Sequence, residues 1–201
     1  MNQENVYTVK SQVADPTTLG LFGLAIVTMV AASNKLGITS DVSGIIPWAI
    51  FLGGIAQIIA SIFDFKHNNL FGATAFSAYG LFWLGVSFTW MTKLGYFGIP
   101  MQESLDMGQF GFALLGYVIL SIFLTISTLK MNPAMFLLLI LIDILLIALM
   151  IYTFTHSSTW GFIAGLAEAG TSLVTFYVLG AKYLNTFFQK TILPVGKPMI
   201  K

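Results

Sequence analysis

The chain has 201 residues, of which 57% are hydrophobic and only 8% are charged. Soluble domains carry roughly 25% charged residues, so this composition excludes an ordinary soluble globular protein. The net charge of +1 gives no reason to expect a nucleic-acid partner, and the absence of cysteine excludes disulfides and cysteine-bound metals.

Six apolar runs are each long enough to cross a hydrocarbon core about 30 Å thick as a helix. The first run lacks the basic flank and small-residue cleavage site of a secretory signal, so it is expected to remain. We predict an all-α integral membrane protein with six transmembrane helices: an N-terminal tail (1–16), a transmembrane domain (17–183) and a C-terminal tail (184–201). The runs lie at residues 17–37, 43–63, 70–92, 108–129, 133–155 and 159–181.

The lysines are unevenly divided between the two sides of the predicted bundle. With six spans both termini share one side, and only Lys35 and Lys93 fall on the other side. The positive-inside bias then places both termini in the cytoplasm. The short termini, without an organelle-targeting segment, favour the plasma membrane of a bacterium or archaeon. The seven lysines on the side of the termini are Lys10, Lys66, Lys130, Lys182, Lys190, Lys197 and Lys201.

The third run carries an unusual face of aromatic and hydroxyl side chains. Its members follow one another at steps of three and four residues, which places them on one side of a helix. Such a face suits a narrow path for a small, partly apolar solute, but it also suits aromatic packing between helices. Gln57 in the second run adds a neutral polar group at membrane depth. The face contains Phe76, Tyr79, Trp83, Ser87 and Trp90, with Thr74 and Ser77 among them.

Two acidic residues lie inside predicted spans, Asp143 in the fifth and Glu168 in the sixth. A charged carboxylate at the centre of a membrane helix costs about 2.5–3.5 kcal/mol on insertion scales, so each acid requires an explanation. One interpretation is a proton site coupled to transport. The other is a neutral acid that hydrogen-bonds neighbouring helices together. The residues by themselves do not separate these interpretations.

The sequence does not indicate an enzyme. It contains no HExxH, GxSxG, P-loop or dinucleotide-binding glycine motif, and we expect no cofactor and no metal site. The chain has no arginine and no lysine in the middle of a span. An anion in a medium of low dielectric constant must be given hydrogen bonds or positive charge. A small monocarboxylate or a neutral acid is therefore an easier cargo than a dicarboxylate.

Several stretches resemble the acetate uptake transporter family, the succinate-acetate permeases. DPTTLGLFG at residues 15–23 resembles the signature that opens the first helix of that family. GGIAQI at 53–58 and NLFGATAFSAYGLFWL at 69–84 resemble its second and third helices, and the third-helix match is highly specific. LN at 184–185 and TILPVG at 191–196 resemble its C-terminal signature, so the resemblance covers the whole chain.

The resemblance implies a six-helix protomer in a homohexamer, with a separate path through each subunit for acetate and in some members succinate. It implies a hydrophobic constriction formed by Leu24, Tyr79 and Ile142. Asp143 and Glu168 are the candidates for proton coupling. The candidates for substrate binding are Thr17, Thr18, Leu19, Gly20, Gln57, Thr74, Phe76, Ser77 and Trp83.

Several functional hypotheses stay open at this point. The leading one is a permease for acetate and similar short carboxylates, working as a proton symporter or as an anion channel. A second is a membrane sensor or scaffold that binds acetate without carrying it. A third is a carrier of another small solute such as ammonium.

Overall fold

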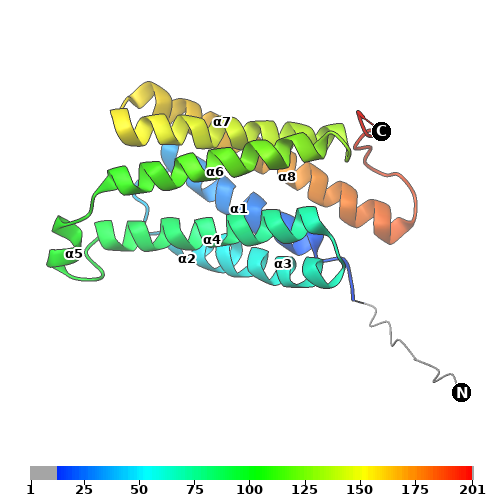
Figure 1. The fold of residues 1–201 in the computed structure, drawn as a ribbon, viewed down its shortest axis with the longest axis horizontal. Helices are drawn as coiled ribbons and strands as arrows, with labels where there is room; N and C mark the ends of the chain where they lie inside the picture. Colours follow the sequence, from blue (N-terminus) through cyan, green and yellow to red (C-terminus); the bar gives the residue numbers. More distant parts are fainter. Residues whose placement is uncertain (1–12, 201) are drawn as a thin grey trace, which may run out of the picture.

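The computed structural model describes residues 13–200, which form a helical bundle (Figure 1). Within that range six helices are long and apolar enough to cross a membrane. This confirms the predicted all-α membrane protein with six spans. Five spans are single helices: α1 (Thr17–Lys35), α4 (Leu70–Lys93), α6 (Met107–Thr128), α7 (Pro133–Thr155) and α8 (Ser158–Phe188). The second span, Ile46–Lys66, joins α2 (Ile46–Trp48), η1 (Ala49–Ala56) and α3 (Gln57–Lys66), and the short α5 (Ile99–Glu103) lies in the loop before α6.

The last helix is longer than its hydropathy predicts. The apolar run ends at residue 181 and the expected transmembrane domain at 183, but α8 continues to Phe188. The apolar signal stops at this point because Lys182 and Asn185 are polar. Both side chains have partners: Lys182 pairs with Asp15, and the Asn185 side chain hydrogen-bonds the backbone of residues 192 and 193. The ion pair joins α8 to the start of α1, and the Asn185 hydrogen bonds hold the segment after α8 against that helix.

A proline that follows an acidic or amide residue stands at the start of two helices. At α7, Asn132 is the N-cap and accepts a hydrogen bond from a backbone N–H three residues on, with Pro133 at the first helical position. At α1 the N-cap is Pro16 rather than Asp15. The Asp15 carboxylate still accepts from the backbone N–H of Thr17 at 2.9 Å.

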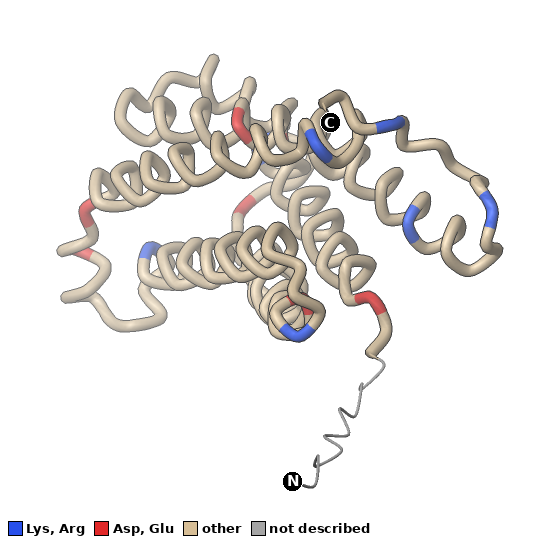
Figure 2. Tube along the Cα trace, turned by 45° about the vertical axis from the view of Figure 1, so that its right-hand side comes forward, with Lys and Arg blue, Asp and Glu red and all other residues tan. Residues whose placement is uncertain are grey.

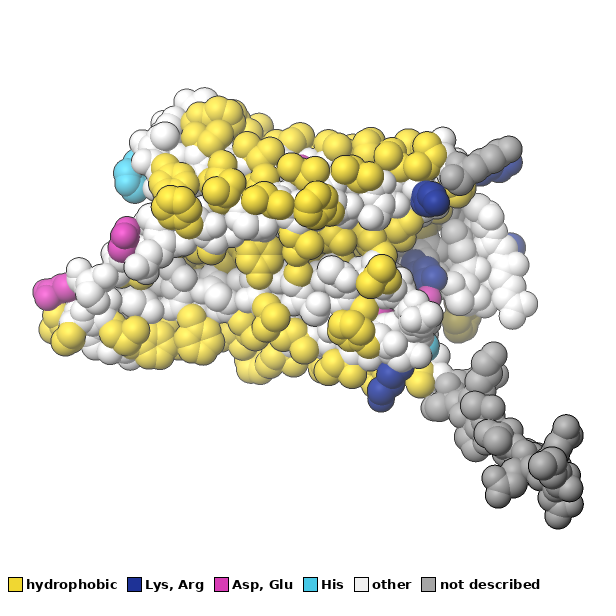
Figure 3. Space-filling view, in the orientation of Figure 1, with side chains coloured by type: hydrophobic (Ala, Val, Ile, Leu, Met, Phe, Trp, Pro, Cys, Tyr) yellow, Lys and Arg dark blue, Asp and Glu magenta, His cyan; other side chains and the backbone are white. Residues whose placement is uncertain are grey.

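The helices are arranged so that α1 packs against both α8 and the second span, while α7 packs between α6 and α8 (Figure 1). Charged residues gather mainly at the two ends of the bundle, although some acidic residues lie within helices (Figure 2). The middle of the visible surface is covered by hydrophobic side chains (Figure 3). This distribution is the one expected of a bundle surrounded by lipid.

Candidate functional site

Two cavities enter the bundle from opposite ends, and they share no lining residue. The first, of about 330 Å³, lies at the end where α1 and α4 begin and α8 ends. We call it the terminal-side cavity. The second, of about 660 Å³, lies where α1 and α4 end and α8 begins, and we call it the opposite cavity. A path through this protomer would have to join the two.

The three predicted constriction residues meet at the inner end of the terminal-side cavity. Leu24, Tyr79 and Ile142 are the deepest residues that α1, α4 and α7 contribute to its wall. All three are buried in the same apolar cluster. On α4 the wall of the opposite cavity begins at Phe82, less than one turn beyond Tyr79. The predicted constriction therefore lies between the two cavities.

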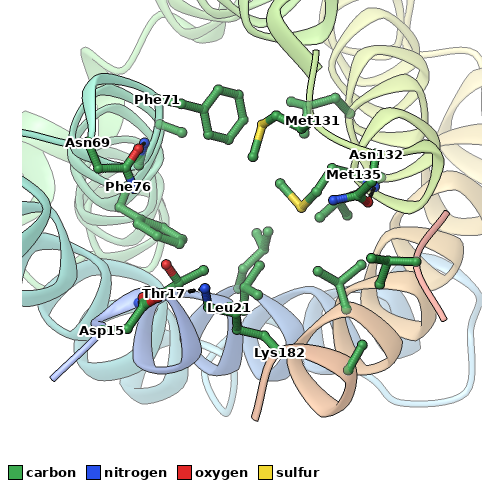
Figure 4. A pocket seen from close by; sticks show the side chains of 18 of the residues that line it. Asp15, Thr17, Leu21, Asn69, Phe71, Phe76, Met131, Asn132, Met135 and Lys182 are labelled. Atoms are coloured by element: carbon green, nitrogen blue, oxygen red, sulfur yellow. Dashed lines mark hydrogen bonds and ion pairs between the residues drawn. The ribbon is translucent and has the colours of Figure 1, made fainter. Parts of the chain in front are cut away.

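Apolar side chains form most of the wall of the terminal-side cavity. Figure 4 shows Phe71 and Phe76 on one side of the opening and Met131 and Met135 on the other. Aromatic and thioether side chains of this kind give a small solute an adaptable apolar surface.

An ion pair lies at the mouth of this cavity. Lys182 Nζ is 2.6 Å from Asp15 Oδ2, and both side chains are about two-fifths exposed (Figure 4). Burial acts to raise the pKa of Asp15, but hydrogen bonds from Lys182 and Thr17 outweigh it and hold the pKa below its ordinary value of 3.8. The mouth therefore presents one fixed cation and one fixed anion.

Gln57 is the most informative polar residue in the wall. Its side chain is fully buried at 0% exposure, lines the terminal-side cavity, and has no hydrogen-bond partner for Nε2 or Oε1 in the described part of the chain. Leaving a buried amide unpaired costs roughly 1–3 kcal/mol, so such groups are rare in folded proteins. An amide held in this way is ready to hydrogen-bond a solute.

The local backbone explains how Gln57 reaches this position. It follows directly on η1, a π-helical segment that contains Gly53 and Gly54. The widened turn brings the carbonyl oxygen of Leu52 so close to α1 that a Cβ at Gly23 would collide with it. Irregular turns of this kind are frequent at functional sites.

The remaining predicted substrate-binding residues are placed unevenly. Thr17 and Phe76 line the terminal-side cavity, whereas Trp83 lines the opposite one. Gly20 makes room for the Phe76 ring, which a Cβ at that position would approach to 2.5 Å. The other four candidates line neither cavity: Thr18, Leu19, Thr74 and Ser77.

Asp143 is half-buried between α6 and α7 and is held by hydroxyl groups. Ser121 Oγ donates to Asp143 Oδ1 at 2.5 Å, and Thr125 Oγ1 donates to Asp143 Oδ2 at 2.7 Å. Ser121 in turn accepts a hydrogen bond of 2.9 Å from the Tyr79 hydroxyl. The acid is thereby connected to the predicted constriction.

Glu168 has a different partner. Its side chain is 2% exposed and its Oε2 lies 2.8 Å from Lys35 Nζ, which reaches it from the last turn of α1. Both residues line the opposite cavity. The negative charge of the Glu168 carboxylate is therefore balanced by the positive charge of Lys35, which lies at the end of α1.

Sequence reasoning missed several of these partners. Ser121 and Thr125 are four residues apart, so they lie on one face of α6, and that spacing was the available signal. Asp64 was also overlooked: it is 1% exposed near the end of α3, where Oδ1 accepts from Asn69 Nδ2 at 2.8 Å. The pairing of Lys35 with Glu168 spans 133 residues and carries no local signal.

Comparison with known proteins agrees with this architecture. Residues 1–197 match the family described as the GPR1/FUN34/yaaH family. The chain is 30% identical over 190 residues to the succinate-acetate/proton symporter SatP of Escherichia coli K12, covering 93% of this chain and 97% of that protein. A solved structure titled as the bacterial acetate channel SatP superposes with a TM-score of 0.85 at 28% identity, covering 92% of this chain and all of that one.

Fungal relatives match over a smaller share of their length. Acetate permease A of Emericella nidulans is 31% identical over 141 residues, which are 65% of this chain and 46% of that protein. The Ammonia transport outward protein 2 of Saccharomyces cerevisiae is 32% identical over 146 residues, or 71% of this chain and 51% of that protein. With a family match over nearly its whole length, this chain belongs to the GPR1/FUN34/yaaH family.

Proposed function

We propose that this protein is a permease that carries acetate and similar short carboxylates, including succinate, across the membrane. The observation that carries the proposal is the terminal-side cavity, which ends at Leu24, Tyr79 and Ile142 and has the unpaired amide of Gln57 in its wall. The names of its relatives support the same cargo, since they include a succinate-acetate symporter, an acetate permease and an acetate channel.

The chemistry of the cavity fits a short carboxylate. The methyl or methylene part of the solute contacts the apolar wall, while its oxygens need hydrogen bonds inside the bundle. An amide both donates and accepts, so Gln57 serves a carboxylate through Nε2 and a protonated acid through Oε1. At the mouth the charge of Lys182 is balanced by Asp15, so this pair adds no net charge that would repel an anion.

The relatives are named both as a proton symporter and as a channel, so both modes are part of the proposal. Asp143 and Glu168 are the proton-coupling candidates. We further propose a homohexamer in the plasma membrane of a bacterium or archaeon, with both termini in the cytoplasm. Lys66, Lys130 and Lys182 lie near the ends of α3, α6 and α8, on the side where the described C-terminal segment begins, which supports this orientation.

One other function competes with the proposal. Export of ammonia, named for one yeast relative, is supported by the neutral amide of Gln57, which would also hydrogen-bond ammonia. An excess of ammonium should then inhibit acetate uptake if both use the same cavity, and leave it unchanged if they do not. An enzymatic role is not part of the proposal. The relatives are named as a symporter and a channel, and cavities that form a transport path need no catalytic residues.

Uptake of labelled acetate into liposomes that contain the purified protein tests this function. We expect uptake above that of protein-free liposomes, which measure the leak of acetic acid through lipid. Gln57→Leu should lower the protein-dependent rate about tenfold, because hydrogen bonds to a charged solute contribute roughly 1.5–3 kcal/mol. The variant should fold at least as well as the parent, since leucine leaves no buried amide unpaired.

Gln109→Leu is the matched control, because Gln109 is exposed near the start of α6 and lines neither cavity. Its uptake should equal that of the parent protein. Uptake by Gln57→Leu equal to that of the parent would show that the Gln57 amide does not bind the solute during transport. No protein-dependent uptake at all would contradict the permease.

A further inference from the structure

Three hydroxyl groups and one carboxylate form a continuous hydrogen-bonded chain beside the constriction. It runs from Tyr79 Oη to Ser121 Oγ at 2.9 Å and on to Asp143 Oδ1 at 2.5 Å. Thr125 occupies the other carboxylate oxygen at 2.7 Å. Tyr79 and Ser121 are 6% and 0% exposed, so this chain is largely shielded from solvent. We call Tyr79, Ser121 and Asp143 the relay.

The direction of every hydrogen bond in the relay follows from the charge on Asp143. A carboxylate accepts and cannot donate, so Ser121 must use its only proton on Asp143. The Ser121 oxygen is then an acceptor for its other neighbour, and Tyr79 must donate to it. With Asp143 ionised, the phenolic proton points away from the cavity. Tyr79 then offers only oxygen lone pairs to a solute at the constriction.

A proton on Asp143 Oδ1 reverses the whole chain. The carboxylic acid donates to Ser121, Ser121 donates to Tyr79, and the phenolic proton is free to point into the cavity. Tyr79 changes from an acceptor to a donor, although no side chain has to leave its place. An anion at the constriction is repelled by lone pairs in the first state and hydrogen-bonded in the second.

We propose that Ser121 is the positioning residue through which the protonation state of Asp143 sets whether Tyr79 accepts from the cargo or donates to it. This inference rests on the proposed function, and it selects proton symport as the mode. When a protonated short acid reaches the constriction, its O–H bond breaks and its proton passes to Tyr79 Oη. The phenolic proton moves to Ser121, and the serine proton moves to Asp143 Oδ1.

The transfer leaves every atom balanced. The cargo is now an anion that accepts a hydrogen bond from Tyr79, and Asp143 is a neutral acid that holds the proton. Return of the proton along the same three groups restores the starting directions and releases the cargo as an acid. One proton therefore travels with each monocarboxylate, and no net charge crosses the membrane.

The side chains around Asp143 give it no ion pair within the described chain. On α6 the titratable side chain is Tyr117, whose hydroxyl donates to the backbone oxygen of Ala78 on α4. On α8, Glu168 pairs with Lys35 and Lys182 pairs with Asp15. Neither of these two ion pairs, the ones formed within residues 13–200, includes Asp143. Asp143 therefore has no cationic side chain as a partner in that range.

The remaining tyrosines of the neighbouring helices do not hydrogen-bond Asp143 in the described chain. Tyr177 on α8 donates to the backbone oxygen of Pro194, and Tyr183 on the same helix is exposed. Tyr152 on α7 lines the opposite cavity. Within the described chain, the hydrogen bonds of the Asp143 side chain go to Ser121 and Thr125 alone.

Dependence of acetate flux on membrane potential tests the relay. Liposomes containing the protein are given a potassium diffusion potential with valinomycin, and the protein-dependent flux of labelled acetate is compared with and without it. The parent protein should show an electroneutral flux that the potential does not change. Ser121→Ala breaks the relay but leaves Tyr79 and Asp143 in place, so the acetate that still passes should do so as an uncoupled anion. Its flux should change severalfold with the potential.

Three further variants serve as a conservative replacement, an alternative way to break the relay, and a control. Ser121→Thr retains the hydroxyl and should remain electroneutral. Tyr79→Phe removes the last hydroxyl but keeps the ring, so it should behave as Ser121→Ala does, and it serves in its place if that variant fails to fold. Ser127→Ala is the control on the same helix, because Ser127 is exposed and bonds only its own helix through the carbonyl of residue 123.

The possible outcomes separate the relay from the permease. Electroneutral flux in the parent, lost in Ser121→Ala and Tyr79→Phe and kept in Ser121→Thr, supports the relay. Acetate flux that follows the potential in the parent, or that stays electroneutral in Ser121→Ala and Tyr79→Phe, overturns the relay and retains the permease. No protein-dependent flux in the parent overturns both.

Discussion

Asp143 and Glu168, the two acids predicted to lie inside membrane spans, are stabilised in different ways. Glu168 is almost completely buried and faces the ammonium group of Lys35. Asp143 is half-buried and faces hydroxyl groups, with no ammonium group among its partners in the described chain. An ion pair is lost when its carboxylate takes up a proton, whereas a hydroxyl serves a carboxylate as donor and a carboxylic acid as acceptor. The difference favours a structural role for Glu168 and is consistent with the place of Asp143 in the proposed relay.

The largest expected effect comes from removing the cation of the ion pair. Lys35→Met leaves the Glu168 carboxylate buried without a partner, and breaking a buried pair in this way costs about 3 kcal/mol or more. The free energy of unfolding, measured by titration with SDS in mixed micelles, should fall by that amount at neutral pH. At acidic pH the loss should be smaller, because a protonated Glu168 no longer needs a cation.

Lys93→Met is the matched control for this variant. Lys93 also lines the opposite cavity, but it takes part in neither ion pair formed among residues 13–200. Its replacement should change the free energy of unfolding little. Equal losses in the two lysine variants would mean that the pair with Glu168 does not hold α1 to α8.

A smaller loss of stability is expected at Asp143. Asn retains one acceptor and one donor for the two hydroxyls, so Asp143→Asn should lower the free energy of unfolding by about 1 kcal/mol, the usual net contribution of a hydrogen bond. The same SDS titration measures it. A loss as large as that of Lys35→Met would show that Asp143 is an obligatory charge, and the contrast between the two acids would then be wrong.

The smallest effect is expected at the exposed pair of Asp15 and Lys182. Solvent screens a pair that is two-fifths exposed, so Asp15→Asn should cost no more than about 0.5 kcal/mol. The pKa of Asp15 is lower in the folded chain than its ordinary value of 3.8. The pair therefore contributes its stability above that value and loses it as the pH falls through the lowered pKa.

The difference in unfolding free energy between Asp15→Asn and the parent should accordingly be present at neutral pH and vanish in strong acid. Lys190→Met offers a comparison, since this exposed lysine takes part in neither ion pair of the described chain. A difference between Asp15→Asn and the parent that persists in strong acid would show that the carboxylate stabilises the fold in some way other than as an anion.

Most of the fold was predictable because membrane helices obey a local rule. Lipid offers no hydrogen bonds, so each span must be a helix that satisfies its own backbone and carries apolar side chains. Such a segment can be recognised from the hydropathy of its own residues, without knowledge of its contacts. The start of α7 is also a local property, because Asn132 as N-cap and Pro133 at the first helical position favour a helix that begins there. The end of α8 was predicted too early because Lys182 and Asn185 are polar, and only their partners in the folded chain explain why the helix continues.

The candidate site was predictable only in part. Gln57 and Tyr79 were singled out from polar and aromatic patterns within single helices, and both line the terminal-side cavity. The π-helical turn before Gln57 was not predicted, and its close contact with α1 at Gly23 exists only in the folded chain. The roles of the site residues stay predictions until transport is measured.

By itself the sequence determined that this chain has six membrane spans, that Asp143 and Glu168 lie within them, and which family it resembles. Each of these properties depends on the composition and order of residues within short stretches. The partners of the acids were decided by the tertiary structure, because α1 meets α8 and α6 meets α7 only once the helices pack. Whether an acid inside the membrane meets an ammonium group or a hydroxyl group determines its chemistry, and that choice lies in contacts between residues far apart in the chain.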